Sequence, residues 1–137
     1  MKTLIRSTLI AVSLSAVAVL LPAHAHHSFP AKYDASKQVH LTGTVTEVQW
    51  TNPHIFIYID VPDEKTGENV NWALEMGGPN ALLRLGWKRD SLKPGDVVTV
   101  EGSLARDGSH LANAKTIVMT STGRKMLAGS SQDGDTQ

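Results

Sequence analysis

His26 and His27 follow Ala23-His24-Ala25, a segment with the small residues that signal peptidase requires at its cleavage site. Cleavage after Ala25 would make His26 the first residue of the mature chain. Its α-amine and Nδ1 could then chelate one metal ion, and a further imidazole would complete a T-shaped set of three nitrogens. Such a set suits Cu(II), which prefers tetragonal ligation by nitrogen and oxygen.

His54 is the predicted third nitrogen donor, because Asn52-Pro53 predicts a turn that would present its imidazole. His27 follows His26 directly, so geometry disfavours binding of one ion by both residues at once. We expect His27 to bind the ion in a second conformation of this segment. A simpler interpretation is that His54 only stabilises the turn through a backbone hydrogen bond. Candidates for an additional oxygen ligand are Asp34 and Glu75.

The first 25 residues have the pattern of a Sec-type signal peptide. Lys2 and Arg6 precede an apolar run from Leu9 to Leu21, and Pro22 ends it. Because a transmembrane helix needs roughly 20 apolar residues, we expect cleavage, no membrane span afterwards, and a periplasmic location. A retained amino-terminal anchor is the alternative. Cleavage after Ala23 would instead expose His24, a product that could also bind copper.

Charge and composition exclude two classes of protein. The 13 basic residues balance 13 acidic ones, and loss of Lys2 and Arg6 with the signal would leave 11 against 13. A chain without basic excess is not expected to bind the phosphate backbone of nucleic acid. The absence of cysteine excludes a disulfide framework. We therefore expect one small domain stabilised by core packing.

The hydropathy pattern divides the mature chain into three parts. We predict an irregular segment over 26–37, a folded domain over 38–128 and a disordered tail over 129–137. Strand-like alternation covers 39–50, 55–61, 70–76, 98–100 and 111–119, with a short helix over 80–85. The alternation changes phase between Val45 and Val48, which predicts a β-bulge.

This order of elements predicts a mainly β fold, a small five-stranded OB-like barrel with one short helix between strands 3 and 4. A small sandwich is the alternative. OB barrels bind ligands across strands 2 and 3 and the neighbouring loops. The simpler account of the aromatic residues there is packing beneath the amino-terminal segment or the helix. The candidate ligand-face residues are Phe56, Tyr58, Trp72 and Trp87.

Several short motifs resemble a group of exported bacterial proteins of unknown function. They are His26-His27-Ser28-Phe29, Tyr33-Asp34, Gly43-Thr44-Val45, Trp50-Thr51-Asn52-Pro53-His54, Gly77-Gly78-Pro79-Asn80, Gly86-Trp87 and Leu92-Lys93-Pro94-Gly95-Asp96. The resemblance covers essentially the whole mature chain and implies no particular activity. More loosely, the pattern is similar to small periplasmic OB-fold proteins, which is a likeness of fold alone.

No catalytic signature accompanies these motifs, so we predict a periplasmic binding module rather than an enzyme. It would bind copper or another small ligand through the histidine cluster of His26, His27 and His54. The alternative is a metal-free protein-interaction or envelope-accessory domain that uses the face of strands 2 and 3. The expected partner is accordingly a small ligand, a metal ion or an envelope protein.

Overall fold

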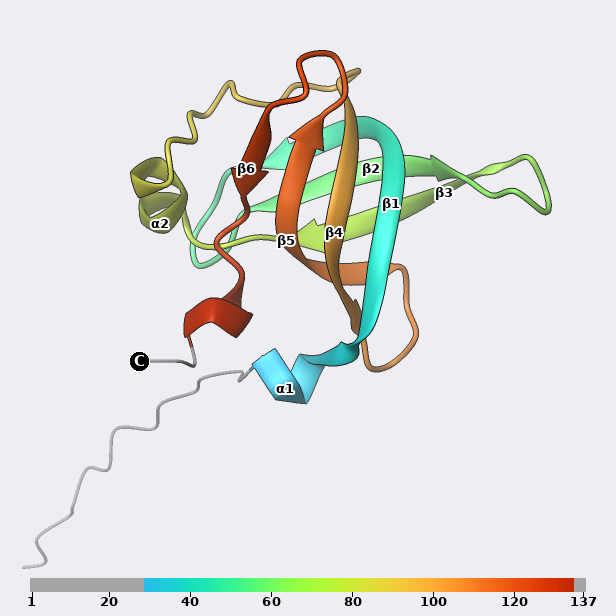
Figure 1. Ribbon diagram of the computed structural model, residues 1–137, viewed down its shortest axis with the longest axis horizontal. Helices are drawn as coiled ribbons and strands as arrows, with labels where there is room; N and C mark the ends of the chain where they lie inside the picture. The colour runs from blue at the N-terminus through green and yellow to red at the C-terminus, as the bar shows by residue number, and fades with distance from the viewer. Residues whose placement is uncertain (1–28, 135–137) are drawn as a thin grey trace, which may run out of the picture.

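Six β-strands form one sheet in the structure, a computed structural model that describes residues 29–134 (Figure 1). The predicted signal peptide, His26, His27 and residues 135–137 lie outside the described residues. The elements in chain order are α1 (Phe29–Lys32), β1 (Tyr33–Gln49), β2 (Phe56–Pro62), β3 (Asn69–Glu75), α2 (Pro79–Arg84), β4 (Val97–Ala105), β5 (Leu111–Met119), β6 (Lys125–Leu127) and the 3₁₀ helix η1 (Ser131–Gly134).

The strand pairings form a ring. The sheet order is β3-β2-β1-β4-β5-β6, and an additional pairing joins β3 to β5. All neighbouring pairs in that order are antiparallel, whereas β3 and β5 are parallel. The prediction of a mainly β fold is confirmed, and α2 follows β3 and precedes β4 as expected.

The long strand β1 contributes to the ring twice, because it pairs with both β4 and β2. Its register against β2 shifts between Val45 and Glu47, at the position of the predicted bulge. A bulge increases local twist and bends the strand. Figure 1 shows β1 bending from its place beside β4 towards β2. Gly43 permits a close approach at this bend, since a Cβ there would lie 2.5 Å from the carbonyl oxygen of Asp60.

Alternation along the strands separates an apolar interior from an outer surface. In and before β2, Ile55, Ile57 and Ile59 are buried, while Phe56 and Tyr58 point outwards and are half-buried. The interior also receives buried side chains from β1, β3, β4 and β5, among them Val45, Leu74, Val98 and Ile117.

Two segments are more ordered than the sequence predicts. Residues 29–37, expected to be irregular, form α1 and the start of β1 because Phe29 and Tyr33 bury their rings against Ala105. The pairing of β1 with β4 is interrupted only between Tyr33 and Gln38. A small second core therefore attaches the amino-terminal segment to the sheet.

The predicted disordered tail is also partly folded. In this predicted tail, Ser130 is buried and η1 covers Ser131–Gly134. Just before it, β6 pairs with β5 as a sixth strand, where the sequence predicts five. The hydroxyl of Ser130 donates to Oδ1 of buried Asn113 at 2.5 Å. A tail without large apolar residues folds here because hydrogen bonds satisfy its polar groups. Within the described residues, the folded unit thus includes the start of the predicted tail.

Candidate functional site

A buried carboxylate with three donors lies at the end of β3. This residue is Glu75, which is only 4% exposed. Its Oε2 accepts hydrogen bonds from Lys32 Nζ and from the Tyr33 hydroxyl, each at 2.5 Å. Its Oε1 lies 2.9 Å from Nδ1 of His54. We call Lys32, Tyr33, His54 and Glu75 the Glu75 cluster.

The Glu75 cluster lies on the outer side of the sheet, beneath α1. Glu75 pairs with Phe56 across β2 and β3, and the ammonium of Lys32 lies 5.7 Å from the centre of the Phe56 ring. The helix is held in this place by Arg106, whose Nε donates to the carbonyl of Pro30 at 2.6 Å. Burial of the Phe29 ring against Tyr33 and Ala105 supplies the remaining attachment.

His54 comes from the connection between β1 and β2. Asn52-Pro53 is a cis peptide bond, and the chain returns to the sheet where Ile55 N donates to the carbonyl of Gly77 at 3.1 Å. A Cβ on Gly78 would lie 2.8 Å from the carbonyl oxygen of Pro53, so glycine is needed for this contact. The loop is thereby held against the segment that follows β3.

Charges in the Glu75 cluster are balanced. Lys32 provides a cation for the carboxylate, and its side chain remains 43% exposed. Burial, followed by the hydrogen bond to Glu75, raises the pKa of Tyr33 far above its usual value, so the phenol keeps its proton and donates it. A neutral His54 that donates from Nδ1 to Glu75 carries its lone pair on Nε2.

A cavity of about 290 Å³ adjoins the Glu75 cluster. A wider groove of about 560 Å³ lies beside it, towards α2 and the tail. Both are bounded by His54 and Ser131, so the imidazole stands between the two spaces. The residues that line the smaller cavity are Phe29, Lys32, Tyr33, Pro53, His54, Glu75 and Ser131.

The structure brings together some of the predicted metal ligands and separates others. His54 and Glu75 are adjacent, but both oxygens of Glu75 already have donors. Asp34 is directed elsewhere: its carboxylate accepts from Ser36 Oγ at 2.7 Å and lies 3.6 Å from Arg106. Within residues 29–134, no three His, Cys, Asp or Glu side chains are grouped to hold a metal ion.

The four predicted ligand-face aromatic residues do not share one face. Phe56 and Tyr58 lie together on the outer side, with ring centres 6.4 Å apart. Trp72 instead packs against the interior, and Trp87 is buried, its Nε1 donating to the carbonyl of Leu127 at 2.8 Å. Trp72 faces inwards because side chains alternate along a strand and its register partner is the buried Ile59.

Lys32 and Tyr33 were missed by the sequence interpretation. Lys32 is one of several basic residues, and Tyr33 falls in a segment predicted to be irregular. Their contacts with Glu75 span 43 and 42 positions of the chain, which no local pattern reveals. The only local signal is the aromatic spacing of Phe29 and Tyr33, one helical turn apart.

Comparisons with known proteins agree with the motif resemblance. No curated protein matches the chain. None of the helices within residues 29–134 is long and apolar enough to span a membrane. Residues 13–114 match a family described as a family of unknown function, DUF6152. Because the match includes most of the sequence, the chain belongs to this family of unknown function.

Proposed function

We propose that this protein is an exported metal-binding module that binds Cu(II) through His54 together with His26 or His27. The observation that carries the proposal is the contact of 2.9 Å between Nδ1 of His54 and the buried carboxylate of Glu75. Histidines that bind metals commonly donate their other ring N–H to a carboxylate, which sets the tautomer and the orientation of the ring. Nε2 of His54 would then be the metal ligand.

Glu75 has a different role in this proposal from the one expected from sequence. It orients His54 and does not contribute an oxygen ligand, because Lys32 and Tyr33 occupy its other oxygen. The ion would therefore meet neutral nitrogen donors, which suit Cu(II). Lys32 lies against the other oxygen of Glu75 and offsets the charge of this buried carboxylate.

The position of α1 supports participation of the amino-terminal histidines. Phe29 and His54 line the same cavity. An extended chain advances at most about 3.6 Å per residue, so a segment of the length from His26 to Phe29 can span up to about 11 Å. If cleavage follows Ala25, the amine and Nδ1 of His26 can reach this cavity. The set would consist of these two nitrogens and Nε2 of His54, with His27 as the alternative imidazole.

We also propose that the ring of strands is an OB-like barrel. The pairings β1-β2-β3-β5-β4-β1, with α2 between β3 and β4, support this assignment. OB barrels bind ligands on strands 2 and 3 and on the loop between strands 1 and 2. His54 belongs to that loop and Glu75 to β3, so the proposed site lies where such barrels bind ligands.

The experiment is a Cu(II) titration of the protein secreted from its full precursor. Its mass reports whether the first residue is His26. We expect one tight equivalent of Cu(II) and a loss of affinity of at least about tenfold in His26→Ala and in His54→Ala. His40→Ala is the control, since this exposed histidine lies 3.7 Å from Glu101 on another part of the sheet. Equal affinity of all four proteins would refute the metal site.

A metal-free interaction domain is the second candidate. The observation that favours it is the stacked, half-exposed pair of Phe56 and Tyr58 on the outer side of β2. Aromatic residues of this kind are enriched at protein interfaces. A partner from the cell envelope would then bind independently of chelator and be lost in Tyr58→Ala. Binding that requires copper would contradict this second candidate.

A further inference from the structure

A groove of about 560 Å³ lies between α2 and the chain that leads from β6 to η1 (Figure 1). Close backbone packing forms its floor. A Cβ on Gly77 would lie 2.6 Å from the carbonyl oxygen of Gly129, and a Cβ on Gly78 would lie 2.8 Å from that of Pro53. The volume of the groove falls within the range of about 300–1,000 Å³ that is typical of sites for small molecules.

The side of the groove that α2 contributes is apolar. Ala81 and Leu85 lie one helical turn apart and both line it. Leu85 is 43% exposed, whereas Leu82, on the inward side of the same helix, is fully buried. A ligand with an apolar body would remove Leu85 from water, which is favourable.

Arg84 supplies the positive charge of the groove, which it lines with an exposed side chain. Among the described side chains, no carboxylate forms an ion pair with Arg84 or lines the groove. Glu75 borders the adjoining cavity instead, where Lys32 matches its charge. His54, the other ionisable side chain at the groove, carries no negative charge. The charges therefore favour an anionic ligand.

We propose that this groove binds a small organic acid, whose carboxylate pairs with Arg84 and whose apolar body covers Ala81 and Leu85. A guanidinium presents N–H donors in pairs that match the two oxygens of a carboxylate. Inorganic phosphate would also pair with Arg84, but it would leave the apolar side of the groove exposed to water. An organic cation would be repelled by the guanidinium.

The floor of the groove favours a free acid over a peptide strand. The N–H of Gly77 donates to the carbonyl of Ala128 at 2.8 Å, and the carbonyl of Gly77 accepts from Ile55 N at 3.1 Å. The carbonyl of Gly78 accepts from Leu82 N at 3.0 Å. These backbone groups are therefore not free to pair with an added strand, which binds through main-chain hydrogen bonds. A free acid needs only a charged partner and an apolar contact.

NMR titration of the ¹⁵N-labelled protein with octanoate tests this proposal. The signals to follow are the backbone amides of Gly77, Gly78 and Gly129, which line the groove. The protein is first dialysed against a chelator, so the outcome does not depend on whether the proposed copper site exists. Acetate supplies the carboxylate without the apolar body, and octylammonium supplies the body with the opposite charge. Inorganic phosphate and an acidic peptide amide test the other occupants.

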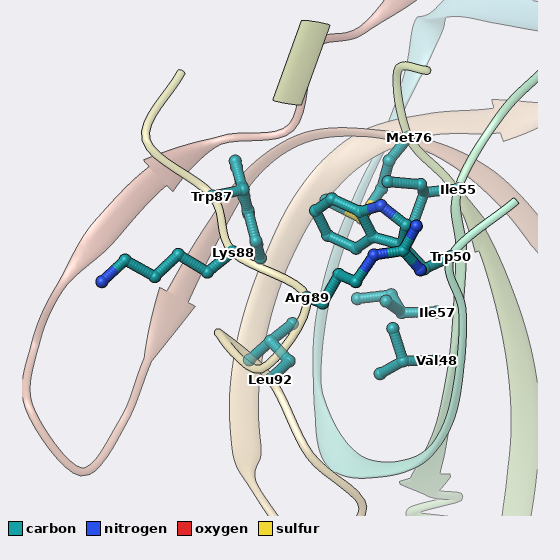
Figure 2. Close-up of a pocket in the computed structure, with 9 residues that line it drawn as sticks. All are labelled: Val48, Trp50, Ile55, Ile57, Met76, Trp87, Lys88, Arg89 and Leu92. Atoms are coloured by element: carbon teal, nitrogen blue, oxygen red, sulfur yellow. The ribbon is translucent and has the colours of Figure 1, made fainter. Parts of the chain in front are cut away.

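We expect octanoate to shift the three glycine signals saturably, with a dissociation constant of about 1 mM. Arg84→Gln should weaken binding at least about fivefold, whereas Arg89→Gln, the matched control, should not. Arg89 is exposed but lies at a different cavity. Figure 2 shows its side chain across the indole of Trp50, with Cζ 5.9 Å from the centre of the ring.

A second pair of variants tests the apolar side of the groove. Leu85→Ala should weaken octanoate binding at least about threefold. Leu83→Ala is its control, because Leu83 is 51% exposed on the same helix but does not line the groove. Acetate should bind at least about tenfold more weakly than octanoate, since it lacks the apolar body. All four substituted residues are exposed, so no variant is expected to disturb the fold.

The proposal is overturned if octanoate produces no saturable shift, or if Arg84→Gln binds it as well as the unaltered protein. It is also overturned if octylammonium or inorganic phosphate shifts the same signals as strongly as octanoate does. Tighter binding of the acidic peptide than of octanoate would overturn it as well, because the groove would then belong to a protein partner.

Discussion

Replacing Glu75 by glutamine tests whether a single buried charge holds α1 and His54 in place. Glutamine preserves the shape of the side chain but has one acceptor oxygen. The carboxylate of Glu75 has two, one facing Tyr33 and the other facing His54. If the glutamine oxygen faces Tyr33, the amide NH₂ group faces Nδ1 of His54. His54 must then accept through Nδ1, which moves its proton to Nε2.

The expected loss of stability can be worked out from the contacts. A hydrogen bond to a charged group contributes about 1.5–3 kcal/mol, against about 0.5–1.5 kcal/mol for a neutral one. Weakening the hydrogen bond of the buried Tyr33 hydroxyl therefore lowers the free energy of unfolding by about 1–1.5 kcal/mol. Lys32 is 43% exposed, so water replaces much of its ion pair and the added loss is under about 1 kcal/mol. The total is about 2 kcal/mol.

Urea denaturation followed by circular dichroism measures this difference. With m values of about 1–3 kcal/mol/M for small proteins, the midpoint should fall by about 1 M. Glu101→Gln is the matched control, because that carboxylate is 51% exposed and lies 3.7 Å and 3.9 Å from His40 and Lys125. The free energy of unfolding of Glu101→Gln should fall by no more than about 0.5 kcal/mol.

The reasoning is refuted if Glu75→Gln shifts the midpoint no more than Glu101→Gln does. A double-mutant cycle with Tyr33→Phe adds a second check, with an expected coupling of about 1 kcal/mol between residues in contact. Copper affinity gives a third, independent readout. Because the substitution moves the proton to Nε2 of His54, Cu(II) binding should weaken by about 10–100-fold.

Three further predictions concern other parts of the fold. Burial raises the pKa of Tyr33 above its ordinary value, so near pH 10 the unfolded chain releases this proton while the folded protein keeps it. The stabilisation by the protonated phenol is therefore complete below about pH 10. Above that pH, the free energy of unfolding declines by up to about 1.4 kcal/mol per pH unit. Urea titrations at about pH 9 and pH 11 should show a smaller decline in Tyr33→Phe, and an equal decline would contradict the assignment. Gly43→Ala should destabilise the fold by about 2 kcal/mol, because the new Cβ would lie 2.5 Å from the carbonyl oxygen of Asp60; an unchanged melting temperature would show that the bulged strand can move aside. Ser130→Ala should cost about 1 kcal/mol, since it removes the donor to Asn113, and should speed proteolysis of the tail; the same digestion rate as in the unaltered protein would argue against its attachment.

The candidate site was predictable only in part. His54 and Glu75 could be named from sequence because imidazoles and carboxylates are the usual metal ligands. Their different roles could not, since they depend on which donors surround Glu75. Lys32 and Tyr33 belong to a segment without strand periodicity, and they enter the site because the ring of Phe29 anchors α1. Asp34 lies apart from the site because its carboxylate accepts from Ser36 and faces Arg106.

Local pattern determined the five main strands and α2, but not α1, β6 or η1. The alternation in 55–61 and 70–76, the change of phase after Val45 and the glycines around α2 specified strands, a bulge and a short helix, because these depend on near neighbours in the chain. Only the tertiary structure decided what covers the outer face of β3. The closure of the ring, the attachment of both ends of the described chain and the burial of Glu75 arise from contacts between distant residues, whose pairing no periodicity encodes.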